Sequence, residues 1–437
     1  MLNERSLTSI EEGIYILNKY SGCFSVATIS HLRGKINLKK LQQSIDIIQD
    51  KYDILRCNII KQDSNLKFKL KELETVKVIL EIIDNCHNKS WEDIVIENIN
   101  QPLNLSKNML RCLLIRPESK DDEAYFITII FHAIADGLSS VKLHYLIFQN
   151  YENIVKNKSI ESRNRLDITS IYNQKFNNIL GYIRAILSVI ELQIRSKFYK
   201  PKKLNPDKII PIKEREGHFL NYCLDEEITK KIIVKSKQEN ITVNSLLTAA
   251  ILLAIADEIK IKEQEKFALY CQCYVDLRKR LDPQVSDEYL EILISSLMSF
   301  YNLKPQTNLL SLAKEVNNKT KKELEKRDFM YYSLLLKPIV KTSINNTQRF
   351  TPSVGVSNLG KINFKRNYGD FTLENICFVP NVSIYNYSLS LSISTFNNKM
   401  TINFAFSYPS FSYEKIDKIA QTMIKILTDT IDSSKNK

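Results

Sequence analysis

Strand-like and helix-like segments follow one another in a similar order in each half of the chain. In the first half, apolar residues at helical spacing over 37–52, with Asn37 as the expected cap, precede two strand-like runs. Strand-like runs at 109–117 and 125–131 flank a polar turn, which predicts an antiparallel pair. The second half restarts with a strand at 218–224 and two helical segments. This order predicts an α+β fold of two related lobes, each a mixed sheet with helices.

Length and proline positions suggest where the lobes divide. A chain of 437 residues is too long for one ordinary core. We expect an N-terminal lobe over 1–160, a crossover linker over 161–215 and a C-terminal lobe over 216–437, because prolines and polar residues cluster in the linker. Two lobes that share one cleft need no further subunit, so we expect a monomer.

The linker contains a basic helical segment around 176–199. Its apolar residues form one extended face: Ile179, Tyr182, Ile183, Ile186, Ile190 and Ile194. In the favoured interpretation the helix packs across the lobes or acts as a lid, because amphipathic helices are common. In the alternative, it makes a peripheral membrane contact and gathers a lipid acceptor.

The chain is basic, with a formal net charge of +13. Such a surface suits nucleic acid, an anionic membrane, a phosphate-bearing cofactor or an acidic protein. The sequence has no zinc-finger spacing, aromatic-rich RNA-binding motif or basic tail, so no nucleic acid is expected as a partner.

The cysteines are scattered, and most lie inside apolar segments. The eight are Cys23, Cys57, Cys86, Cys112, Cys223, Cys271, Cys273 and Cys377. The first residues are charged and polar, unlike a secretory leader. We therefore expect reduced, structural cysteines, no metal and a cytoplasmic location. Cys271 and Cys273, two positions apart on a predicted strand, would point the same way.

The segment 125–140 changes character halfway, because a run of aromatic and branched residues stops at His132. Asp136 and Gly137 follow. A histidine at a strand end can serve as a general base, since its ordinary pKa of about 6.5 leaves it neutral near pH 7. The alternative is a structural histidine with Asp136 as a helix cap. The other four histidines are expected to be structural or solvent-facing: His31, His87, His144 and His218.

Several short strings, in order and at matching spacing, resemble one superfamily. "FHAIADG" fits its H-x-x-x-D-G motif, with Phe131 in place of the first histidine of some members. The other matching strings are "KYDILR", "QPLNL", "NITVNSLLTAAILLAIA", "YVDLRKRL" and "VSNLGKI". The chain thus resembles the chloramphenicol-acetyltransferase-like superfamily, which includes peptide-synthetase condensation domains. It is most similar to polyketide-associated and alcohol acyltransferases, and lacks the plant-type D-F-G-W-G motif.

The resemblance implies a role for each site residue. His132 would be the catalytic base in a tunnel between the lobes. Asp136 and Gly137 would shape the loop, with Asp136 in a salt bridge to Arg278; the alternative for Arg278 is a solvated charge at a strand end. Ser357 and Asn358 would stabilise the oxyanion, unless Asn358 instead caps a turn.

The resemblance also implies a substrate class. An acyl group would pass from coenzyme A or an acyl carrier protein to a hydroxyl or amine of a small-molecule or lipid acceptor, with no permanently bound cofactor. Two alternatives stay open. A free-standing condensation enzyme would carry two histidines, and Phe131 replaces one of them. A non-catalytic relative that binds carrier proteins would have lost His132 or Asp136, and both are present.

Overall fold

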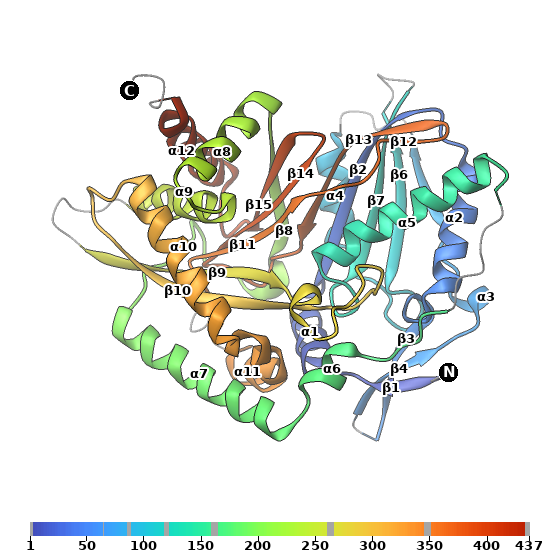
Figure 1. Ribbon diagram of the computed structural model, residues 1–437. Helices are drawn as coiled ribbons and strands as arrows, with labels where there is room; N and C mark the ends of the chain where they lie inside the picture. Colours follow the sequence, from blue (N-terminus) through green and yellow to red (C-terminus); the bar gives the residue numbers. More distant parts are fainter. Residues whose placement is uncertain are drawn as a thin grey trace.

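The computed structural model describes residues 3–63, 65–84, 89–117, 122–158, 165–259, 266–344 and 351–432. These residues form two six-stranded sheets and one three-stranded sheet. The two larger sheets lie side by side, each with its own helices (Figure 1). The predicted two-lobed α+β fold is therefore confirmed. Cys86, expected to be a reduced structural cysteine, and His87, expected to be structural or solvent-facing, lie outside the described residues.

The first large sheet has the strand order β12-β13-β2-β7-β6-β5. Its strands are β2 (Ser25–Gly34), β5 (Leu80–Asp84), β6 (Leu110–Arg116), β7 (Glu123–Phe131), β12 (Asn367–Tyr368) and β13 (Phe371–Pro380). As predicted, β6 and β7 are antiparallel. Helix α2 (Leu38–Lys51) packs on α5 (Gly137–Val155), and Asn37 caps α2 as expected.

Strand β7 is covered on both faces. Phe126 and Ile130 belong to the core that contains α5, whereas Ile127 and Ile129 share a second core with α4 (Trp91–Ile99). A strand buried on both faces needs apolar residues at every position. This requirement explains why the run before His132 is mostly apolar and does not alternate; its one polar residue, Thr128, is hydrogen-bonded to His144.

The second large sheet has the order β10-β9-β11-β14-β15-β8. Its strands are β8 (Glu216–Leu224), β9 (Phe267–Asp276), β10 (Ile294–Leu303), β11 (Val354–Lys361), β14 (Leu389–Phe396) and β15 (Lys399–Tyr408). Its helices are α8 (Glu226–Gln238), α9 (Val243–Glu258), α10 (Leu309–Lys326) and α12 (Tyr413–Asp432). Helix α9 packs against α10 and α12, and most of its residues are buried. A helix enclosed in this way is apolar all round.

The two sheets exchange chain segments. Strands β12 and β13 come from the segment 216–437, which the sequence analysis assigned to the second lobe, yet they belong to the first sheet. Strand β13 pairs antiparallel with β2 along most of its length. The chain therefore does not divide between the two sheets at a single point.

Smaller elements complete the molecule. The three-stranded sheet contains β1 (Glu4–Ser6), β3 (Cys57–Gln62) and β4 (Asn65–Leu70). The remaining helices are α1 (Ser9–Ser21), α3 (Leu73–Val76), α6 (Ile171–Phe176), α7 (Ile179–Tyr199) and α11 (Leu336–Ser343), with 3-10 turns η1 (Asp53–Arg56), η2 (Ile212–Glu214), η3 (Arg278–Arg280) and η4 (Asp328–Leu335). Helix α1 and strand β10 were not predicted from the sequence.

Within the described ranges, no single helix is long and apolar enough to cross a membrane. Helices α8 and α9 satisfy the length and composition test only as a pair bent by 105°.

Candidate active site

A cavity of about 830 Å³ lies between the two lobes. Residues of α1, β2 and α5 line it from the first lobe, and residues of β9, β10 and β11 line it from the second. Helices α7 and α11 also contribute to its wall. Of the predicted site residues, His132, Gly137, Ser357 and Asn358 line the cavity. Asp136 and Arg278 are fully buried outside this lining.

His132 immediately follows β7, with one ring nitrogen held by the backbone. Its Nδ1 lies 2.9 Å from the carbonyl oxygen of Ala135. Because a carbonyl oxygen can only accept, Nδ1 must carry the hydrogen, and Nε2 keeps the lone pair. The ring stacks on Phe24 at 5.7 Å between centroids. Among the described residues, Nε2 has no hydrogen-bond partner, so it is available to a molecule in the cavity.

The charge state of His132 suits a base. Burial lowers the pKa of His132 below its ordinary value, and the bond to Ala135 offsets this effect only in part. The imidazole is consequently neutral near pH 7. A neutral, oriented imidazole with one free nitrogen is able to accept a proton from a bound substrate.

Asp136 combines the two roles that the sequence left as alternatives. Its Oδ1 accepts from the backbone N–H of Ser139 at 2.8 Å and so caps α5. Its Oδ2 accepts from Arg278 at 2.8 Å and from the backbone N–H of Leu293 at 2.9 Å. Both charged side chains are fully buried. The predicted ion pair is therefore present, and it joins α5 of the first lobe to the second lobe.

Arg278 is the centre of a network that spans the two lobes. Besides Asp136, its guanidinium donates to Asp276 at 3.1 Å and to the Ser139 hydroxyl at 2.7 Å. It also donates to the carbonyl of Glu291 at 2.9 Å. Burial opposes the positive charge, but the two carboxylates outweigh it, so the pKa of Arg278 is raised. The predicted alternative, a solvated Arg278, is wrong.

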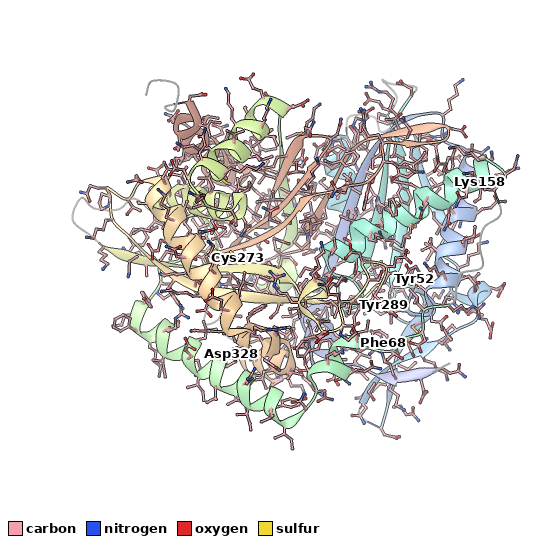
Figure 2. The ribbon with its side chains drawn as sticks, in the orientation of Figure 1. Tyr52, Phe68, Lys158, Cys273, Tyr289 and Asp328 are labelled. Carbon is pink, nitrogen blue, oxygen red and sulfur yellow. The ribbon has the colours of Figure 1, made fainter. Side chains whose placement is uncertain are left out.

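The segment between β9 and β10 crosses to the first lobe and reinforces this joint. The hydroxyl of Tyr52 donates to the Glu288 carbonyl at 2.7 Å, and Lys51 pairs with the Glu288 carboxylate at 3.1 Å. Figure 2 shows Tyr52 and Tyr289 in this region. The end of α2 and the start of α5 are thus both held by the same segment of the second lobe.

Gly137 is required for a close approach rather than for a turn. A Cβ at this position would lie 2.7 Å from the ring of Phe378 on β13. Phe378 itself lines the cavity. Phe131, which occupies the place of a first histidine, is fully buried in the core of the first lobe.

Ser357 and Asn358 lie on β11, in the cavity wall opposite the first lobe. The Oδ1 of Asn358 accepts from the backbone N–H of Gly360 at 2.8 Å. Gly360 has a φ of 68°, which glycine adopts without strain. Asn358 therefore caps this turn, and its amide nitrogen is the group left to donate into the cavity.

Strand β9 supplies cavity residues that the sequence analysis missed. Tyr270, Gln272 and Tyr274 line the cavity, whereas Cys271 and Cys273 are buried in the core of the second lobe. The two cysteines point the same way, as predicted, with their sulfur atoms 3.8 Å apart. Side chains alternate along a strand. The prediction that Cys271 and Cys273 share one face therefore implied that Tyr270, Gln272 and Tyr274 share the other face, which lines the cavity.

Charged side chains in the cavity wall are mostly basic. In the part of the chain that the structure describes, four lysines line the cavity: Lys142, Lys197, Lys279 and Lys361. The acidic residues there are Asp276, which pairs with Arg278, and Asp287. This excess of lysines favours a ligand that carries negative charge.

The other described histidines do not line the cavity. Burial lowers the pKa of His144 to about 3, and its ring bridges the hydroxyls of Ser30 and Thr128 at 2.8 Å each. His31 lies 3.3 Å from the carboxylate of Glu123. Across the described ranges, no three His, Cys, Asp or Glu side chains are grouped so that they could hold a metal ion.

Comparisons with known proteins agree with this architecture. A family model described as "Condensation domain" matches residues 1–175, and one described as "Phthiocerol/phthiodiolone dimycocerosyl transferase C-terminus" matches 218–405. The curated proteins include no match.

Three solved structures illustrate the fold. Polyketide synthase associated protein 5 from Mycobacterium tuberculosis is 16% identical with a TM-score of 0.73, covering 98% of each chain. The epimerization domain from the third module of tyrocidine synthetase B is 16% identical with a TM-score of 0.73, covering 100% of this chain and 98% of its own. A trichothecene 15-O-acetyltransferase from Fusarium sporotrichioides is 14% identical with a TM-score of 0.71, covering 97% and 95%.

These findings define a two-lobed protein with a chloramphenicol-acetyltransferase-like fold and a histidine-bearing cavity between the lobes. The chain is thus similar to condensation domains over residues 1–175 and to phthiocerol/phthiodiolone dimycocerosyl transferases over residues 218–405, and it shares their two-lobed fold.

Proposed function

We propose that the protein transfers an acyl group from a phosphopantetheine thioester to a hydroxyl or amine, with His132 as the general base. The observation that carries the proposal is the orientation of its ring, with Nδ1–H tied to Ala135 and Nε2 free beside the cavity. The lysines of the cavity wall suit the phosphates of coenzyme A or of a carrier-bound arm.

The proposed step is a direct attack with both substrates bound. Nε2 of His132 takes the proton of the acceptor O–H or N–H as that atom attacks the thioester carbonyl carbon. A C–O or C–N bond forms, the C–S bond breaks, and the imidazolium returns the proton to the departing thiolate. No cysteine of the described ranges lines the cavity, which favours this route over an acyl-cysteine intermediate.

Ser357 and Asn358 are the proposed donors to the oxyanion. Both lie on the second-lobe wall of the cavity, so a carbonyl held between the lobes would face them while the acceptor faces His132. Donors of this kind typically contribute about 10²–10³-fold to the rate. Asp136 and Arg278 would act indirectly, by positioning the start of α5 against the second lobe.

The test is acyl transfer by the wild-type protein and a His132→Ala variant. A panel of acyl-coenzyme A donors and loaded carrier proteins would be mixed with small alcohols and amines, and products scored by mass spectrometry. We expect His132→Ala to lower turnover by about 10²–10⁴-fold, the usual contribution of a general base. His31→Ala, outside the cavity, is the matched control and should retain activity. Equal turnover in wild type and His132→Ala would contradict the proposal.

A further inference from the structure

Helix α7 exposes a stripe of large apolar side chains. Of the fourteen large hydrophobic residues that are exposed in the described part of the chain, nine belong to this helix. They are Ile179, Leu180, Tyr182, Ile183, Ile186, Leu187, Ile190, Ile194 and Phe198. At 100° per residue they cover one side of the helix, so the exposure is a continuous surface rather than isolated residues.

The buried side of α7 has the opposite character. Its buried positions are the small residues Gly181, Ala185 and Ser188. A Cβ at Gly181 would lie 3.2 Å from Leu334 of η4, so the helix is packed closely on the protein. An ordinary surface helix buries its bulky apolar stripe and exposes polar residues. In α7 this arrangement is inverted, so packing against the lobes does not account for the large side chains.

The helix also separates the cavity from the surface. Val189, Leu192 and Ser196 of α7 line the cavity. Figure 1 shows α7 at the outer edge of the molecule. One helix thus contacts the candidate active site on one side and presents an apolar surface on the other.

Basic residues accompany the apolar stripe near its C-terminal end. Lys200 is exposed close to Phe198, which is 80% exposed, and Lys197 is exposed where the helix also lines the cavity. Arg184 and Arg195 lie over the rings of Tyr331 and Phe300 and so face the protein. A bulky apolar face with lysines and an aromatic residue at its edge is typical of helices that lie in a membrane interface.

We propose that α7 docks the protein on an anionic lipid bilayer, with its apolar stripe inserted at the headgroup boundary. Charge selects this occupant over a second copy of the chain, because two molecules of net charge +13 repel each other whereas an anionic surface attracts both the lysines and the whole protein. The docking does not depend on which reaction the cavity supports. If the proposed acyl transfer is correct, this geometry places the cavity beside lipid-borne acceptors.

Vesicle flotation of the full chain tests this proposal. Wild-type protein would be mixed with vesicles of phosphatidylcholine alone or with 30% phosphatidylglycerol, where the second composition should bind it more strongly and lose it at high salt. The variant Ile186→Ser/Ile190→Ser removes the centre of the stripe and should weaken binding at least about tenfold. Lys200→Gln, which removes an exposed lysine outside the cavity lining, should weaken binding to the anionic vesicles alone.

The matched control is Ile79→Ser/Val234→Ser, which removes two exposed apolar side chains outside α7 and should bind as wild type. Circular dichroism checks that every variant is folded, as expected for exposed positions. Equal loss in the control, or no vesicle binding by the wild type, would overturn the proposal. Two other results would also overturn it. One is a dimer in sedimentation velocity that the variant Ile186→Ser/Ile190→Ser abolishes. The other is binding to an acyl carrier protein, and not to vesicles, that the same variant abolishes. None of these outcomes alters the test of His132, which uses soluble substrates.

Discussion

Removing the charge of Asp136 tests whether the lobes are joined as the structure indicates. Asp136→Ala loses the ion pair with Arg278, the N–H of Leu293 and the cap on Ser139. Breaking a buried pair from one side costs about 3–5 kcal/mol, and a lost cap about 1 kcal/mol. Asp276 still faces Arg278 at 3.1 Å, which softens the loss. We therefore expect the free energy of unfolding to fall by about 4 kcal/mol.

The coupling free energy between Asp136 and Arg278 tests the ion pair more directly than the effect of either single variant. Arg278→Met leaves the carboxylate buried with two backbone N–H donors but without its cation. In the double variant neither charge is stranded, so the double loss should be smaller than the sum of the single losses by about 2–3 kcal/mol.

Urea unfolding measures this coupling. Fluorescence of Trp91 on α4 reports on unfolding of the first lobe, and far-UV circular dichroism reports on both lobes. Where the two unfolding transitions coincide, a single free energy of unfolding describes the protein. The matched control is the exposed pair Arg116–Asp84, whose atoms approach to 2.6 Å and whose side chains are 46% and 47% exposed. Solvent screening should keep that coupling below about 1 kcal/mol. An Asp136–Arg278 coupling no larger than the control would refute the reasoning.

Three further outcomes follow. Because burial lowers the pKa of His132, kcat/KM should stay level as the pH falls to about 6.5 and decline only below it; a decline centred above 6.5 would contradict the assignment. Gly137→Ala should cost roughly 1–3 kcal/mol in unfolding experiments because its Cβ would meet Phe378 at 2.7 Å, whereas Gly355→Ala, with its nearest neighbour at 3.5 Å, should cost less. Burial raises the pKa of Glu291 to about 7, so its contribution to stability is present below pH 4.5 and is lost as the pH rises through 7; melting temperatures of Glu291→Gln should lack that decline.

Much of the candidate site was readable from local sequence. The apolar run before His132 predicted a strand that ends at the histidine, and β7 ends at Phe131. A helix cap was one of the two roles considered for Asp136, because it precedes a helical segment, and Asp136 does cap α5. These features depend on neighbours within a few residues, where backbone geometry links sequence directly to structure.

Other features depend on residues that are distant in the chain. Asp136 and Arg278 are separated by 142 positions, and only the resemblance to a superfamily suggested their contact. The position of β13 in the first sheet was not predicted, because the sequence of an apolar strand does not indicate which sheet the strand joins. Which sheet such a strand joins depends on how much apolar surface the whole folded chain buries.

Helix α7 shows most clearly the difference between what the local sequence determines and what the tertiary structure determines. The sequence by itself determined that a helix would form and that its apolar residues would share one side, because both follow from a period of 3.6 residues. Only the tertiary structure decided that this side is exposed, since Gly181, Ala185 and Ser188 allow the opposite side to approach the protein closely. Periodicity defines a face of a helix, but what surrounds the helix decides whether that face meets the core or the solvent.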